Sequence, residues 1–74
     1  MEKIKFNEAA VGQKFYGRKK LIFMKIKKVF LHTKETIKHE RNVVIINGDG
    51  INKTGSLGFI PDHLLVTPVE IEDL

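Results

Sequence analysis

The chain has 74 residues and a formal net charge of +4, with 42% hydrophobic and 30% charged residues. A chain of this length forms one small domain with a marginal core, because it buries only about 60–65% of the surface that its unfolded form exposes. The sequence contains no Cys, which excludes disulfides, thiol nucleophiles and Cys-ligated zinc. The longest apolar runs, "LIFM" and "VVII", are too short to span a membrane, and we expect a cytoplasmic protein.

Positive charge is concentrated in the middle of the chain. Ten Lys and Arg residues but only two Glu residues lie between Lys14 and Arg41. The last five residues, "EIEDL", contain three acidic side chains. A basic body with an acidic tail indicates an anionic partner, and it is equally typical of a small Lys-rich protein whose charge serves solubility.

Strand patterns recur along the first half of the chain. Residues 7–13 predict a lead-in loop or a single turn, "KFYG" (14–17) a short strand, and "RKK" a basic turn. In "LIFMKIKKVFL" (21–31), apolar residues spaced by two predict a bent strand. We expect Phe30 and Leu31 to return to the core after the Lys27-Lys28 interruption.

The second half alternates between polar segments and short apolar runs. Residues 32–42, "HTKETIKHERN", favour a long exposed hairpin loop over a helical turn capped by Thr33. "VVIIN" is a β-branched run typical of a strand covered on both faces. "GDGINKTGS" predicts a turn region, followed by short strands at "LGFI" and "VTPVE". Five short strands without a long helix predict an all-β protein with a small five-stranded barrel, since closure removes unpaired edges.

The stretch "GFIPDHLLV" (58–66) interrupts a strand pattern with Pro61, which cannot donate a ladder hydrogen bond. We expect one 3₁₀ turn over residues 62–64, which places Leu64 or Leu65 in the mouth of the barrel. Pro68 then requires the last strand to lie at an edge of the sheet.

This stretch resembles the closing segment of Src-homology-3 domains, with Gly58, Pro61 and Leu65 on matching positions. The resemblance implies a barrel with a 3₁₀ turn before its last strand. The family's peptide-binding members use Trp, Tyr and an acidic loop to hold proline-rich ligands. Here Trp is absent and Leu64 replaces the Tyr, so binding of such peptides is not expected. The start, "FNEAAVGQKFYG", resembles small bacteriophage β-barrel proteins of unassigned function.

The candidate ligand-binding residues are basic, with one aromatic among them. Arg18, Lys19 and Lys20 share one turn, and Lys25 and Lys27 are expected to project from one face of a strand. Tyr16 or Phe15 could stack a base while cations meet phosphates. A solvated lysine surface with Phe15 in the core explains the same residues equally well. The full set is Lys14, Tyr16, Arg18, Lys19, Lys20, Lys25, Lys27, Lys28 and Lys53.

Catalysis and metal binding have little support in the sequence. Ser56 lies in a Gly-rich turn with no His or acid nearby, which favours a turn residue over a nucleophile. The His and Glu residues at positions 32, 35, 39 and 40 match no strong zinc spacing, and Lys53 precedes Gly55 without the P-loop order. We therefore expect no enzyme, no metal and no cofactor.

The most economical hypothesis is a phage-encoded binding protein that recognises nucleic acid or a signalling nucleotide and interferes with host defence or transcription. The alternative is a protein inhibitor that docks on a host enzyme through residues 32–42 and the acidic tail. Because the core is small, a homo-oligomer is plausible. The expected core aromatics are Phe6, Phe23, Phe30 and Phe59.

Overall fold

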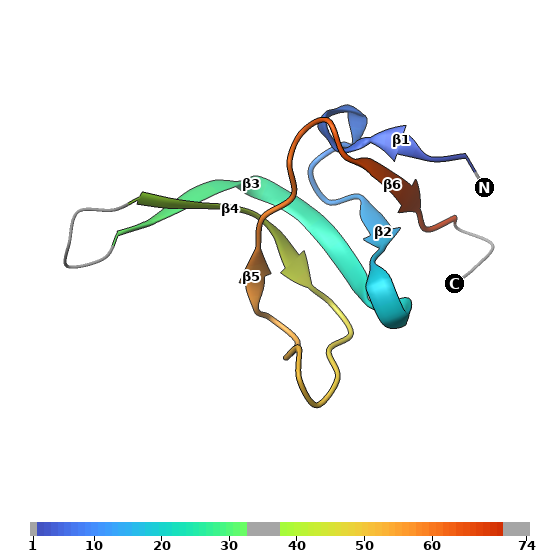
Figure 1. The fold of residues 1–74 in the computed structure, drawn as a ribbon. Helices are drawn as coiled ribbons and strands as arrows, with labels where there is room; N and C mark the ends of the chain where they lie inside the picture. Colours follow the sequence, from blue (N-terminus) through green and yellow to red (C-terminus); the bar gives the residue numbers. More distant parts are fainter. Residues whose placement is uncertain (1, 33–37, 71–74) are drawn as a thin grey trace.

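The structure is a computed structural model that describes residues 2–32 and 38–70. For Lys19, His32 and Lys38 it describes the backbone alone. These residues form six strands and two short 3₁₀ helices (Figure 1): β1 Ile4–Lys5, η1 Phe6–Glu8, β2 Lys14–Tyr16, η2 Arg18–Lys20, β3 Ile22–His32, β4 Lys38–Ile45, β5 Leu57–Gly58 and β6 Leu65–Pro68. No helix in the described part of the chain is long and apolar enough to cross a membrane.

The strands form one antiparallel sheet in the order β1-β6-β2-β3-β4-β5. The mainly β class expected from the sequence is confirmed, with six strands in place of the five predicted. The sheet is not closed into a barrel, because no pairing joins β1 to β5 among the described residues.

The core lies on one face of this sheet, where η1 covers it. Phe6, Phe15, Val43 and Val66 are each at most 6% exposed. The rings of Phe6 and Phe15 meet edge to face with centroids 5.5 Å apart, a favourable aromatic geometry. The amide of Phe6 donates to the carbonyl of Leu64 at 2.8 Å, which fixes η1 against the segment before β6.

Burial alternates from Val43 to Ile46, as the two-residue period of a strand requires. Val43 and Ile45 are buried, whereas Val44 and Ile46 on the other face are only half-buried. The expectation that this strand is covered on both faces is therefore met in full on one face and in part on the other. One face supplies the core, and the neighbouring face keeps partial contact with solvent.

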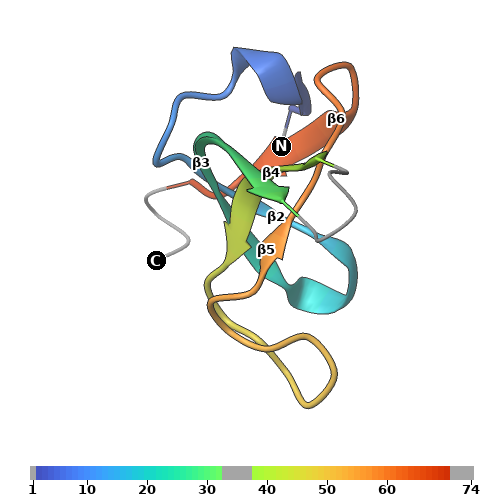
Figure 2. The same ribbon diagram turned by 90° about the vertical axis from the view of Figure 1, so that its left-hand side faces the viewer.

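The long strands β3 and β4 continue past the core as a projecting hairpin. Their register shifts between Lys25 and Val29, and pairing then runs from Val29 opposite Arg41 to His32 opposite Lys38. We call residues 29–32 and 38–41 the arm, which extends away from the other strands in Figure 1 and points at the viewer in Figure 2.

The arm corrects two expectations from the sequence. His32 and residues 38–42 belong to strands and not to a long loop, while 33–37 lie outside the described residues. Phe30 and Leu31 do not return to the core, since they are 52% and 43% exposed. A two-stranded hairpin has no layer above or below it to bury these two side chains. Outside the arm, Phe59 was also expected in the core and is 49% exposed.

The segment between β5 and β6 is held by one buried side chain. Asn42 is 2% exposed, and its amide accepts from the backbone N–H of Ile60 at 2.9 Å and donates to the Ile60 carbonyl at 2.7 Å. Asn42 thus takes the place of a strand partner after β5 ends at Gly58. Ile60 is brought against the core by this contact.

The turn expected after Pro61 is present, but it does not bury Leu64 or Leu65 as the expected barrel required. A single hydrogen bond joins the Leu64 amide to the Pro61 carbonyl at 3.1 Å, and Leu64 and Leu65 remain 47% and 57% exposed. The last strand is not at an edge, because β6 lies between β1 and β2. Pro68 is tolerated because β1 pairs only with the first two residues of β6.

The predicted turn region between β4 and β5 is confirmed as a loop with tight backbone contacts. A Cβ at Gly48 would lie 2.2 Å from the amide nitrogen of Thr54, so no other residue fits without movement. Gly55 adopts a φ of 89°, which glycine reaches without strain. Asp49 accepts hydrogen bonds from the amides of Ile51 and Asn52 at 2.8 and 2.7 Å.

Candidate binding surfaces

An open groove runs between β2, η2 and the segment that leads into β6. Its floor contains Phe15 and Phe23, whose rings are stacked with centroids 5.9 Å apart. Tyr16, Arg18 and Lys3 also line it, and no carboxylate is among the described residues that do so. Its volume of about 890 Å³ is in the range of small-molecule sites. The groove therefore combines aromatic surface with cations that no lining acid neutralises.

The helix η2 is a tight connection between β2 and β3. The amide of Gly17 donates to the carbonyl of Leu21 at 2.7 Å, and the amide of Leu21 donates to the backbone carbonyl of Arg18 at 3.1 Å. The ring of Phe23 packs against Gly17, where a Cβ would lie 2.0 Å from a ring carbon. Lys20 ends the helix with a φ of 65°, a conformation that costs a non-glycine residue about 1–2 kcal/mol. This connection places Arg18 at the groove.

The loop between β4 and β5 is tied to η2 by one asparagine. The side-chain oxygen of Asn47 accepts from the amide of Ile22, and its nitrogen donates to the Lys20 carbonyl at 3.2 Å. The same loop brings Asn52 to the groove, with the exposed Lys53 next to it. Asn47 therefore sets the spacing between two sides of the groove.

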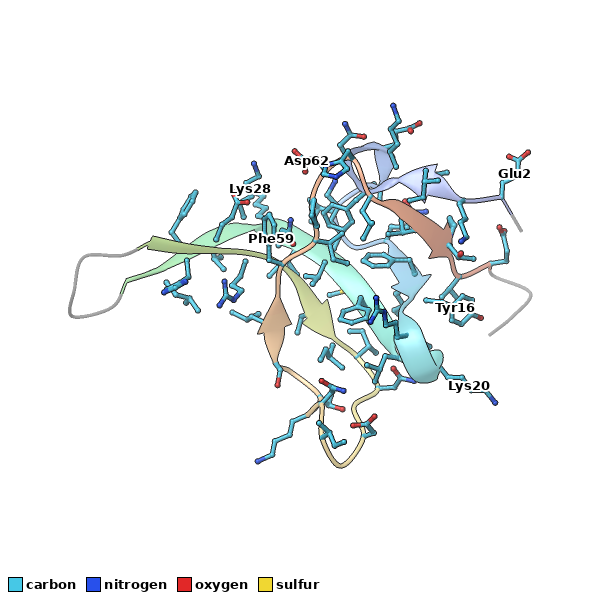
Figure 3. All side chains as sticks on the ribbon, in the orientation of Figure 1. Glu2, Tyr16, Lys20, Lys28, Phe59 and Asp62 are labelled. Carbon is cyan, nitrogen blue, oxygen red and sulfur yellow. The ribbon has the colours of Figure 1, made fainter. Side chains whose placement is uncertain are left out.

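The predicted basic residues do not form one continuous face. Lys20 lies at the η2 end of β3 and Lys28 lies at the arm, as Figure 3 shows. Lys14 is exposed on β2, and Lys27 is exposed near the arm. The side chain of Lys19 lies outside the described residues. Of the predicted residues whose side chains the structure describes, Tyr16 and Arg18 line the groove together, and the others do not line it.

Lys25 has a structural role that its sequence position did not indicate. Its ammonium donates to the carbonyls of Phe6 and Ala9 at 3.1 and 2.7 Å and lies 4.7 Å from the centroid of the Phe6 ring. The ammonium therefore holds η1 and is not displayed beside Lys27. The prediction that Lys25 and Lys27 both project from one exposed face is therefore wrong for Lys25.

The arm carries the second candidate surface. Val29, Phe30 and Leu31 are 38%, 52% and 43% exposed, although they are large apolar residues. A shallow hollow beside them is lined by His39, Glu40, Arg41 and Phe59. Phe59 lies where the chain after β5 passes β4, as Figure 3 shows.

Electrostatic contacts on the arm are few. Lys28 and Glu40 form an ion pair at 3.5 Å with side chains 56% and 30% exposed, so it contributes little to stability. The guanidinium of Arg41 donates to the backbone carbonyl of Glu40 at 2.8 Å. Lys27, which precedes Lys28 in the chain, is also exposed. The arm therefore presents positive charge next to apolar side chains.

Titration and metal binding give no further site in the described residues. The backbone amides of Asn52 and Ile51 lower the pKa of Asp49 below its ordinary value of 3.8, as expected for an exposed turn carboxylate that accepts hydrogen bonds. No group of three His, Asp or Glu side chains gathers in the described part of the chain, and Glu35 lies outside it.

Sequence reasoning missed Lys3, Asn52, Leu64 and Leu65 as groove residues. Lys3 reaches the groove because Ile4 pairs with Val66, a contact between the two ends of the chain. No local pattern carries that information. One of the two leucines was expected in the mouth of a barrel, and their apolar character was the only available signal.

Comparisons of the chain with protein-family models, with curated proteins and with solved structures give no match.

Proposed function

We propose that this protein is a non-enzymatic binding protein that recognises a ligand carrying both a planar ring and phosphate, through the groove between β2, η2 and β6. The ligand is a nucleotide, either free or within a single-stranded nucleic acid. The observation that carries the proposal is the presence of Tyr16, Arg18 and Lys3 on one groove without a lining carboxylate.

The chemistry of these side chains matches such a ligand. Arg18 is exposed and presents a planar fork of donors suited to phosphate oxygens, and Lys3 adds a second charge. Tyr16 is half-buried, and its backbone pairs with Thr67 of β6. An exposed part of an aromatic ring can stack a base at about 1–3 kcal/mol per base.

Binding is tested by titrating labelled nucleotides and short single-stranded oligonucleotides at several salt concentrations. With two phosphate contacts, the slope of log affinity against log salt for a single strand is expected at about −1.4. If a free nucleotide binds as well as the oligonucleotide, the ligand is a free nucleotide. If the oligonucleotide binds much more tightly, the ligand is a single-stranded nucleic acid. Absence of binding for both contradicts the proposal.

Substitutions assign the binding to the groove. Arg18→Glu together with Lys3→Glu is expected to abolish binding, and Tyr16→Leu to weaken it while keeping apolar burial. Lys14→Glu together with Lys27→Glu changes the net charge by the same amount at two exposed positions that do not line the groove, and it serves as the matched control. Exposed cations contribute little to folding, so the melting temperatures of the charge variants should stay close to that of the parent. Equal loss of binding in the control would show that net charge and not the groove is responsible.

A second candidate function is protein docking through the arm, favoured by the exposure of Val29, Phe30 and Leu31. Exposed apolar clusters rimmed by polar residues mark interaction sites more often than isolated apolar residues do. In this case the arm would engage a host enzyme, and the groove would serve another purpose. Phe30→Asp with retained nucleotide binding but lost cellular effect would favour this candidate.

The resemblance to Src-homology-3 domains and to small phage proteins supports a binding role over an enzymatic one. Gly58 and Pro61, which carry the first resemblance, precede the last strand, and a turn follows Pro61. On this proposal the protein acts in the cytoplasm of a bacterial host and interferes with defence or transcription. Expression of the Arg18→Glu/Lys3→Glu variant in the host, compared with the parent, tests that role.

A further inference from the structure

The arm leaves two backbone edges open to an additional strand. In the described residues, β2 pairs with β3 only over Ile22, Phe23 and Met24, and backbone hydrogen bonds to the segment before β2 end at Lys25. Beyond this point β3 pairs with β4 alone. Unpaired edges with exposed apolar side chains and no Pro are templates for strand addition.

The chemistry of the arm defines what can pair with it. Phe30 is exposed on one face of the arm, and Val29 and Leu31 are exposed on the other. The nearby cations are Lys27, Arg41 and Lys28, of which Lys28 pairs with Glu40. An extended segment that mixes apolar and acidic side chains would bury the apolar side chains of the arm and neutralise its cations. Residues 71–74, "IEDL", are such a segment, with two acids and two aliphatic residues.

We propose that the arm of one chain receives the C-terminal segment, residues 71–74, of a second copy. Five residues beyond Val69 extend at most about 17 Å. The molecule is 44 Å long, and β6 and the arm lie at opposite sides of it in Figure 1. The segment therefore meets the arm of another copy and not its own. Two reciprocal contacts of this kind close a two-fold dimer.

The proposal has a clear signature in sedimentation equilibrium of the whole chain from about 1 μM to about 1 mM. The parent is expected to shift from monomer to dimer mass. Truncation after Glu70 and Phe30→Asp should each weaken dimerisation about tenfold or more, as loss of a central contact does. Ile51→Asp is the matched control, because Ile51 is 85% exposed in the loop between β4 and β5 and should leave dimerisation unchanged.

Mixing the two defective chains separates this contact from other modes of association. The truncated chain keeps an intact arm, and the Phe30→Asp chain keeps an intact C-terminal segment. Their mixture should therefore form a heterodimer that neither forms alone, with a weaker affinity than the parent because one contact replaces two. Raised salt should weaken it further, since the contact is between opposite charges.

Three results would overturn the proposal. A parent chain that stays monomeric at about 1 mM has no such contact, and its arm is then free for a foreign protein. A truncated chain that dimerises as tightly as the parent must use a symmetric contact between arms or sheet faces. Mixed defective chains that remain monomeric, despite unchanged melting temperatures, show that the segment and the arm do not meet.

Discussion

Phe15 and Phe30 are the same residue type on neighbouring strands of one sheet, and they have opposite surroundings. Phe15 is 1% exposed between Phe6 and Phe23, whereas Phe30 is 52% exposed on the arm. Full burial of a Phe side chain stabilises a fold by about 1.5–3 kcal/mol, and Phe30 forgoes much of that. The core region is therefore organised for stability, and the arm keeps apolar surface that the isolated chain does not use.

The boundary between the two regions is the register shift in β3. Before it, Lys25 pairs with Val43 and its side chain holds η1. After it, the two strands pair only with each other among the described residues. A bulge bends a strand and increases its twist, which turns the arm away from the core. The same two strands thus form part of the core at one end and expose apolar side chains to solvent at the other.

The variants Ile45→Asp and Phe30→Asp test most directly whether the core region and the arm differ in their contribution to stability. Ile45 is 7% exposed, and an unpaired carboxylate there costs several kcal/mol, comparable to the roughly 5 kcal/mol total of a small domain. We expect the Ile45 variant to be unfolded and the Phe30 variant to melt within a few degrees of the parent, as followed by circular dichroism. A Phe30 variant that also unfolds would mean that the arm is part of the core.

Asn42→Ala tests the border between the arm and the core. Its removal leaves the amide and carbonyl of Ile60 without their partner, and each orphaned group costs about 1–3 kcal/mol. We expect a loss of about 2–4 kcal/mol in urea unfolding. Asn7→Ala, at an exposed position of η1, is the matched control and should stay close to the parent. Equal losses in the two variants would contradict the role of Asn42.

Lys25→Met is expected to have a smaller effect. Met keeps the aliphatic stem but loses two hydrogen bonds to carbonyls, which are worth about 1.5–3 kcal/mol for a charged donor and less where water can replace it. A loss of about 1–2 kcal/mol in urea unfolding follows. Lys27→Met, at an exposed position, should change stability by less than about 0.5 kcal/mol. If both variants lose the same amount, the ammonium of Lys25 does not hold η1.

The sequence predicts the strands of the core region because their signal is local. Alternating apolar residues mark β3, and the β-branched run marks β4. Lys25 was assigned to the surface because its acceptors lie 16 and 19 residues away, beyond any local pattern. Asn42 was likewise assigned to a loop, since its partner Ile60 is 18 residues away.

The arm and the groove were harder to predict, for different physical reasons. A hairpin exposed on both faces needs no apolar alternation, so the polar residues 38–42 resemble a loop. The groove depends on the pairing of β1 with β6, which joins residues near the two termini. Tyr16 and Arg18 were nevertheless found, because a basic turn beside an aromatic strand is a local signal.

The smallest expected effect concerns acid and the loop between β4 and β5. The pKa of Asp49 is lowered in the folded state by the amides of Asn52 and Ile51, so ionised Asp49 stabilises this loop above its ordinary pKa of 3.8. That contribution is lost as the pH falls through the lowered folded value. Because Asp49 is fully exposed, the loop should loosen without unfolding the core.

Amide proton shifts measured by NMR between pH 5 and pH 2 can follow this titration, since the relevant carboxyl pKa values lie near 4 or below. The amides of Ile51 and Asn52 should move together with a midpoint below 3.8, and Asp49→Asn should remove that movement. The amides of the arm should not follow the same midpoint, because no contact links them to Asp49 among the described residues. A common midpoint in both regions would indicate that acid acts on the whole fold and that the two regions are not independent.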